Sequence, residues 1–301
     1  MTKKALVLGG GGPVGIAWES GLLTGFAEAG VDLSDADFIL GTSAGSFVGA
    51  QLAMGVSPAS LAKPFLAMGD APKTPKPAAP TRDSAWPPPD LTVLMRKMAE
   101  ANSGRRPAQE VRAEIGAWAL EQSTMSEDDF IRSFGRFLSE LPPDAWPEKG
   151  YACTAVDALD GSFRLWDKAA GVGLARAVAS SCSVPVVYPP ITINGRRYID
   201  GGMRSAVNAD MATGYELVVV VAIRVASGDS EVARRMRQGL DAEIQVLVDG
   251  GARVELVTPD EASVTAFGPN LMDVRRRPDA ARAGVTQGRT SAESIRPAWN
   301  N

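Results

Sequence analysis

Residues 38–53 read FILGTSAGSFVGAQLA. A short apolar run opens this stretch, a Gly-x-Ser-x-Gly turn occupies residues 41–45, and a small-residue helical pattern closes it. We therefore predict a strand, a sharp turn and a helix, with Ser43 lifted off the sheet edge between Gly41 and Gly45. The amino terminus of such a helix favours negative charge beside the serine. This turn predicts either a serine that supports an oxyanion-forming reaction or an ordinary strand-to-helix connection.

Length and composition predict a soluble globular chain, and we expect it to form one domain over residues 1–301. Hydrophobic residues make up 45% of the sequence and charged residues 22%. The net charge of −4 provides no broad basic surface, so we expect no nucleic-acid partner. No run approaches the roughly 18 apolar residues of a membrane span. We expect a cytoplasmic protein, with peripheral contact at membranes as an alternative location.

The sequence contains no histidine. A Ser-His-Asp triad and every histidine-ligated metal site are therefore excluded. The two cysteines, Cys153 and Cys182, lack the spacing of metal ligands, and we expect them to be buried free thiols. We expect neither a metal nor a cofactor, and a reactive Ser43 needs a base other than imidazole.

A second glycine-rich stretch follows the apolar run of residues 5–8, which predicts a buried parallel strand. Gly9 to Gly12 and Gly15 come next, and a helical pattern with large apolar residues at spacing four begins there. The pattern Gly-x-Gly-x-x-Gly also occurs in dinucleotide-binding folds, which require an acidic residue at the end of the second strand. Here the second strand ends in Leu40-Gly41-Thr42-Ser43, so the acidic residue that a dinucleotide-binding fold requires is absent from its end. The other use of these glycines is to aim backbone N–H groups at an oxyanion.

Residues 71–147 are predicted to form an insertion. Its first part, residues 71–90, is rich in proline and reads either as a surface loop or as a lid over a site. Helices are predicted at residues 91–98, 108–120 and 127–141. The rest of the chain alternates, with strands at 151–157, 162–166, 191–193, 196–200, 217–223 and 253–257, helices at 174–181 and 231–248, and a mostly helical ending after residue 260.

Asp200 is the best-placed carboxylate to act as a base, because Asp200-Gly201-Gly202 directly follows a strand-like run. Taken alone, the tripeptide reads as a plain Asp-Gly turn. Together the three motifs, in the order glycine-rich loop, Gly-x-Ser-x-Gly and Asp-Gly-Gly, resemble the patatin-like phospholipases. The resemblance spans residues 4–225 and includes the segment 179–190 and Asn208.

The chain departs from the family pattern in two places. Members commonly have Arg or Lys within the glycine motif, where this sequence has Pro13-Val14. Asn208 is followed by Ala209-Asp210, where the family often has a proline at the second position. Neither departure changes Ser43 or Asp200.

The resemblance implies a three-layer α/β/α fold with a mainly parallel central sheet and a helical insertion. It also implies a Ser-Asp dyad formed by Ser43 and Asp200. Oxyanion-hole donors are expected from Gly10, Gly11, Gly12 and Ala44. The supporting glycines of the motifs are Gly15, Gly41, Gly45, Gly201 and Gly202.

The activity implied is that of a serine acyl hydrolase of the phospholipase A type, which acts in lipid degradation through an acyl-serine intermediate. Its substrate would be a fatty-acyl ester of a phospholipid, a lysophospholipid or a glyceride. Two alternatives stay open. One is a catalytically silent lipid-binding or regulatory protein of the same fold, and the other is a nucleotide-binding α/β protein.

Overall fold

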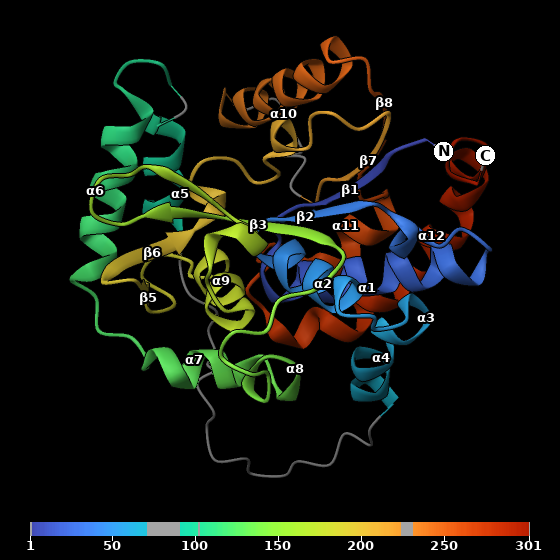
Figure 1. Ribbon diagram of the computed structural model, residues 1–301, viewed down its shortest axis with the longest axis horizontal. Coiled ribbons are helices and arrows are strands. Elements are labelled where there is room, and N and C mark those ends of the chain that lie inside the picture. The colour runs from blue at the N-terminus through green and yellow to red at the C-terminus, as the bar shows by residue number, and fades with distance from the viewer. Residues whose placement is uncertain (1, 71–90, 102, 224–230, 301) are drawn as a thin grey trace.

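A central sheet organises the computed structural model, which describes residues 2–70, 91–101, 103–223 and 231–300 (Figure 1). The sheet has eight strands in this part of the chain. They are β1 (Lys4–Leu8), β2 (Phe38–Gly41), β3 (Gly150–Asp157), β4 (Phe163–Trp166), β5 (Ile191–Ile193), β6 (Arg196–Asp200), β7 (Leu217–Val221) and β8 (Arg253–Val257).

Helices lie on both faces of this sheet. They are α1 (Gly12–Glu28), α2 (Ala44–Ala53), α3 (Pro58–Leu61), α4 (Lys63–Asp70), α5 (Thr92–Ala101), α6 (Ala108–Leu120), α7 (Glu127–Ser133), α8 (Arg136–Ser139), α9 (Leu174–Ser181), α10 (Glu231–Asp249), α11 (Glu261–Phe267) and α12 (Arg277–Trp299). Short 3-10 turns include η4 (Gly201–Met203) and η5 (Ala209–Met211).

The strand order is β5-β6-β3-β2-β1-β7-β8, with β4 paired to β3 outside this path. Strands β3, β2, β1, β7 and β8 are parallel, and β4, β5 and β6 extend the sheet in antiparallel pairings. The hairpins predicted at residues 160–161 and 194–195 are confirmed, since they join β3 to β4 and β5 to β6. The predicted, mainly parallel three-layer α/β/α fold is confirmed.

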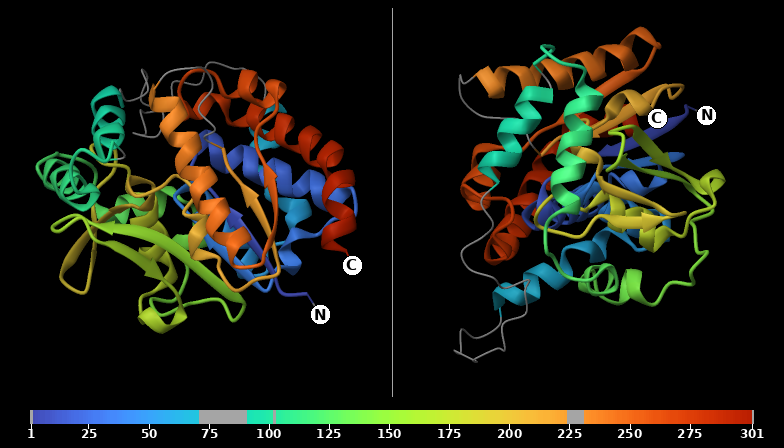
Figure 2. Two further views of the ribbon diagram at one scale, coloured as in Figure 1. Left: turned by 90° about the horizontal axis from the view of Figure 1, so that it is seen from above. Right: turned by 90° about the vertical axis from the view of Figure 1, so that its left-hand side faces the viewer.

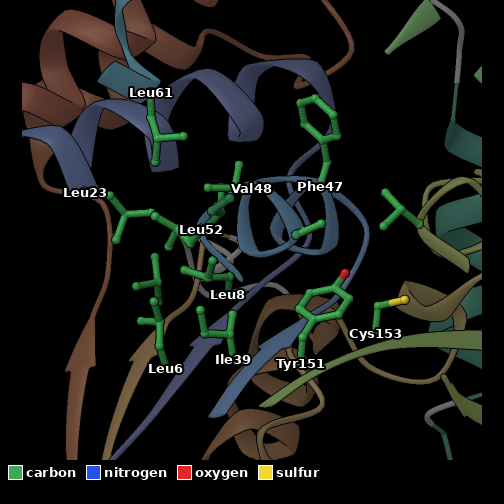
Figure 3. Close-up of a cluster of buried hydrophobic side chains, with 14 of the residues drawn as sticks. Leu6, Leu8, Leu23, Ile39, Phe47, Val48, Leu52, Leu61, Tyr151 and Cys153 are labelled. Atoms are coloured by element: carbon green, nitrogen blue, oxygen red, sulfur yellow. The ribbon is translucent and has the colours of Figure 1, made fainter. Parts of the chain in front are cut away.

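Alternation along the strands explains why both faces of the sheet are buried. In β1, Leu6 and Leu8 point to one face, whereas Ala5 and Val7 point to the other. Helices α1, α2, α9 and α12 cover the first face, and α10 covers part of the second (Figure 2). Figure 3 shows Leu8 and Ile39 facing Val48 and Leu52 of α2 within the larger core.

Helices α5 and α6 pack on the antiparallel part of the sheet, where Leu94, Val111 and Ile115 meet Val156 and Ile199. The helix predicted over residues 127–141 is wrong in one respect, because two short helices, α7 and α8, occupy it. Gly135 has a φ of 76° between them, a backbone angle that no helix accommodates. The proline-rich stretch 71–90 lies outside the described residues, so the expected lid and the extent of the insertion stay predictions. Within the described ranges, the structure contains no helix long and apolar enough to span a bilayer.

Candidate active site

The loops that follow β1 and β2 meet at one edge of the sheet because these neighbouring strands are parallel. The N–H of Gly45 donates to the carbonyl oxygen of Gly9 at 3.0 Å. A Cβ atom at Gly45 would lie 2.1 Å from the carbonyl oxygen of Leu8, so only glycine allows this approach. The carboxyl ends of parallel strands are where ligands bind in open α/β sheets.

Ser43 lies at the sharp turn between β2 and α2, as predicted. Its backbone has φ 51° and ψ −115°, a strained conformation for a residue other than glycine. The side chain makes no capping hydrogen bond to α2 although the residue is the N-cap. The hydroxyl is therefore not used to hold the helix, and the positive end of the α2 dipole lies beside it.

Several contacts hold the Ser43 backbone in this strained conformation. Its N–H donates to Ser181 Oγ at 3.0 Å. Its carbonyl oxygen accepts hydrogen bonds from Ser46 Oγ at 2.6 Å and from Cys182 Sγ at 3.0 Å. Burial, followed by the charge of Asp200, raises the pKa of the Cys182 thiol. The thiol is thus protonated and able to donate at neutral pH, and both cysteines are buried and free, as predicted.

Asp200 is the last residue of β6 and is 2% exposed. Its N–H donates to the carbonyl oxygen of Ser183 at 3.0 Å, and its Oδ1 accepts from the Gly202 N–H at 2.7 Å. A Cβ at Gly201 would lie 2.1 Å from Thr154 Oγ1, so β3 approaches the Asp200 turn closely. The carboxylate is thus fixed at the end of a strand and oriented by the turn that follows it.

Ser43 and Asp200 line the same cavity, which has a volume of about 380 Å³. Residues 10–12 of the glycine-rich loop line it as well. The rest of the wall is mainly apolar. It includes Leu91 and, from α5, Leu94, Met95 and Met98, together with Met236 and Leu240 of α10, and residues 203–207 also line it. Sequence reasoning did not foresee this wall, because nothing local in α5 or α10 indicates that the two helices border one cavity.

The expected oxyanion donors require one correction. The N–H of Gly10 already donates to the carbonyl oxygen of Ala206 at 2.7 Å, so this group is not available to a ligand. The N–H groups of Gly11, Gly12 and Ala44 have no acceptor among the described residues. Gly12 has a φ of 60°, which suits glycine and helps to turn the loop toward the cavity. Three of the four expected donors therefore remain candidates.

The supporting glycines of the motifs lie where the chain is crowded. Positions 15, 41 and 201 leave no room for a Cβ, which would come within 3.0 Å of Ile223, Ser46 and Thr154, respectively. A Cβ at Gly202 would lie 2.8 Å from Asp200 Oδ1. The sequence assigned no role to Ser181, within the family-like segment 179–190, or to Thr154. The contacts of these two hydroxyl residues to the site join chain segments more than 100 residues apart.

No curated protein matches the sequence significantly. The crystal structure of VipD from Legionella pneumophila is similar with a TM-score of 0.48 and 14% identity, over 98% of this chain and 67% of VipD. The crystal structure of the type III effector protein ExoU is similar with a TM-score of 0.38 and 14% identity, over 97% of this chain and 53% of ExoU.

Residues 6–213 match the sequence profile of the family described as patatin-like phospholipase. This range contains the glycine-rich loop, the Ser43 turn and the Asp200 turn, and it covers more than half of the chain. The protein therefore belongs to the patatin-like phospholipase family.

Proposed function

We propose that the protein is a serine acyl hydrolase that cleaves fatty-acyl esters of phospholipids, lysophospholipids or glycerides. The observation that carries this proposal is that Ser43, in its strained turn, and the buried Asp200 line one apolar cavity. Membership of the patatin-like phospholipase family supports a lipid-hydrolase activity. A lipid substrate also implies peripheral contact with a membrane surface.

In the proposed first step, Ser43 Oγ attacks the ester carbonyl carbon while Asp200 accepts the hydroxyl proton. The new Oγ–C bond forms as the carbonyl π electrons move onto oxygen. The N–H groups of Gly11, Gly12 and Ala44 stabilise this oxyanion, and removal of one such donor typically costs about 10²–10³ in rate. Collapse of the intermediate breaks the C–O bond, and the leaving alcohol takes the proton from Asp200.

In the second step, water attacks the acyl-serine, and Asp200 is again the base. The water proton moves to Asp200 and then to Ser43 Oγ as the fatty acid departs. The apolar wall formed by α5 and α10 would hold the acyl chain, because a buried methylene group contributes about 0.8 kcal/mol to binding.

Two substitutions and one reagent test the proposal. Ser43→Ala and Asp200→Asn should each abolish hydrolysis of p-nitrophenyl acyl esters and leave the circular-dichroism spectrum unchanged. A fluorophosphonate should label the wild type stoichiometrically at Ser43. Hydrolysis by purified Ser43→Ala protein at the wild-type rate would overturn the proposal that Ser43 is the nucleophile.

Pro13-Val14 stands where family members commonly have Arg or Lys in the glycine motif. This departure favours a second candidate function, a catalytically silent lipid-binding or regulatory protein of the same fold. Such a protein would bind lipid vesicles but would not react with the fluorophosphonate. A nucleotide-binding protein would instead show a thermal shift with a dinucleotide. The labelling experiment therefore separates the hydrolase from both alternatives.

A further inference from the structure

A buried set of hydrogen bonds joins the chain on either side of Ser43 and Asp200. Thr42 directly precedes Ser43, and its Oγ1 lies 2.9 Å from Thr154 Oγ1 of β3. Thr154 in turn packs against Gly201, the residue that follows Asp200. Asn208 completes the set, because its Nδ2 donates to Thr42 Oγ1 at 3.0 Å. Thr42, Thr154 and Asn208 are fully buried, and we call these three residues the polar clamp.

The orientation of the Asn208 amide is determined by its other partners. Nδ2 also donates to the carbonyl oxygen of Ser205 at 2.7 Å, and a carbonyl can only accept. Oδ1 accepts from Arg204 Nη1 at 2.7 Å, and a guanidinium can only donate. The amide therefore presents an N–H, and not an oxygen, to Thr42.

The backbone at Asn208 adds a second constraint. Its φ of 56° and ψ of 36° place it in the left-handed region, which asparagine tolerates better than most residues. The Asn208 N–H donates to Ser205 Oγ, and the next N–H, of Ala209, donates to Glu243 of α10 at 2.8 Å. The amide is thus held from the backbone side as well as from the side-chain side.

We propose that the polar clamp positions the Ser43 turn relative to the Asp200 turn, so that Thr42, Thr154 and Asn208 are positioning residues for the reaction. This inference rests on the proposed function. Ser43 and Asp200 come from β2 and β6, which are separated in the sheet by β3. The clamp connects them through β3 itself. A misplacement of about 1 Å between reacting groups can cost about 10² in rate.

The clamp predicts that the hydroxyl of Thr42 matters more than its shape. Thr42→Val keeps the size of the side chain and removes the hydroxyl, whereas Thr42→Ser keeps the hydroxyl and removes a methyl group. If Thr42 only fills space, valine should be the better replacement. If the Thr42 hydroxyl positions Ser43, the Thr42→Ser variant should retain most of the activity. The Thr42→Val variant should then have a kcat lower by about 10² and a KM changed less than about twofold.

A matched pair of controls lies on α1. Thr24 is also buried, and its Oγ1 donates to the carbonyl oxygen of Pro58 at 2.7 Å, away from the cavity. Thr24→Val and Thr24→Ser should lower thermal stability in the same way as the Thr42 pair while kcat stays within about twofold. Rates are to be expressed per folded molecule, as measured by circular dichroism.

Asn208 is tested by Asn208→Gly, because glycine tolerates the left-handed backbone and removes the amide without adding charge. The matched control is Asn194→Gly, which has the same backbone region in the exposed hairpin turn between β5 and β6. Asn208→Gly should slow fluorophosphonate labelling by about 10², and Asn194→Gly should not. In the double variant Thr42→Val/Asn208→Gly the loss of rate should be smaller than the product of the two single losses, because both substitutions remove the contact between Asn208 and Thr42.

Crystal structures of the wild type and Thr42→Val separate a failure of this inference from a failure of the proposed function. The expected result is a displaced Ser43 backbone relative to Asp200 in the variant. An unreactive wild type would overturn the proposed hydrolase, and the displacement would still decide whether the clamp positions the two turns. Wild-type kcat in Thr42→Val, or an unmoved Ser43 in its structure, would overturn the clamp.

Discussion

Glu19 of α1 is fully buried, and neither of its carboxylate oxygens has a hydrogen-bond partner in the described structure. Burial raises the pKa of this carboxyl well above its ordinary value of 4.5. The Gly9 N–H lowers that pKa to a smaller degree, since this group already donates to the Val221 carbonyl oxygen at 3.0 Å. Glu19 therefore keeps its proton to a higher pH in the folded protein than in the unfolded chain.

The first prediction concerns the pH dependence of stability. Because the folded-state pKa is raised, the contribution of Glu19 is fully present below pH 4.5 and is lost as pH rises toward the folded-state value. Within this window the folded wild type loses stability as pH rises, because the unfolded chain releases the proton that the folded chain still binds. Glu19→Gln removes the ionisation, so its stability advantage over the wild type should grow from pH 4.5 upward.

Urea unfolding of the wild type and Glu19→Gln between pH 4 and pH 8 measures this advantage. Glu148→Gln, which replaces a carboxylate that is 91% exposed and paired at the surface with Lys168, is the control for loss of an exposed charge. An advantage for Glu19→Gln that is independent of pH would show that the carboxyl has the same pKa in the folded and unfolded states.

At the scale of elements, α1 and α12 pack against each other (Figure 2), and a seam of glycines lies between them. The seam consists of Gly21 and Gly25 on α1 and Gly284 and Gly288 on α12. A Cβ at any of these positions would lie 2.2–2.3 Å from a carbonyl oxygen of the facing helix. Close approach of the two backbones is possible because these positions carry no side chain.

The second prediction is that Gly25→Ala and Gly288→Ala each destabilise the fold by about 1–3 kcal/mol, because the facing backbone cannot move aside cheaply. Gly239→Ala is the matched control, since a Cβ at Gly239 of α10 meets nothing within 4 Å. An alanine there should stabilise the helix by up to about 1 kcal/mol. Chemical denaturation measures the free energy of unfolding of the three variants. Equal changes at all three positions would show that close packing of α1 on α12 does not require glycine.

At the scale of the whole molecule, the cavity collects residues from the first 12 positions, from the Ser43 and Asp200 turns and from α5 and α10. Its volume of about 380 Å³ gives the scale of the chain that it encloses, and further methylene groups would extend out of its opening. A methylene group is close in size to a water molecule, which takes ~30 Å³ in the liquid, so about a dozen such groups fit.

The third prediction is therefore a chain-length optimum for the proposed hydrolase. Among p-nitrophenyl esters from C4 to C16, kcat/KM should rise to about C10–C12 as methylene groups are buried and then stop rising. Met98→Ala should move the optimum to longer chains, because Met98 lines the apolar wall. A profile that is highest at C4 in both proteins would contradict an acyl-binding role for the cavity.

The fourth prediction follows from the absence of histidine in all 301 residues. If Asp200 is the base, the acidic limb of kcat/KM reports a carboxylate and lies below the imidazole range near pH ~6.5. Diethylpyrocarbonate, used as a reagent for imidazole, should leave activity intact. An acidic limb near neutrality that persists in Asp200→Asn would show that another group is the base.

The sequence by itself determined the local elements and the order of the motifs. Period-two and helical patterns predicted β8, α6 and α9 with their observed bounds, because burial on one face repeats with the geometry of the element. Asp160-Gly161 and Asn194-Gly195 predicted their hairpins because these residues favour tight turns. The break at Gly135 was missed, since the apolar pattern continues through it.

Only the tertiary structure decided which groups are free to act. The Gly10 N–H is taken by Ala206, and Asn208 donates to a threonine 166 residues away in the chain. The α1–α12 seam and the α5–α10 wall likewise join distant segments. Such contacts leave no periodic trace in the sequence, because each depends on where two separate elements lie once the whole sheet has formed.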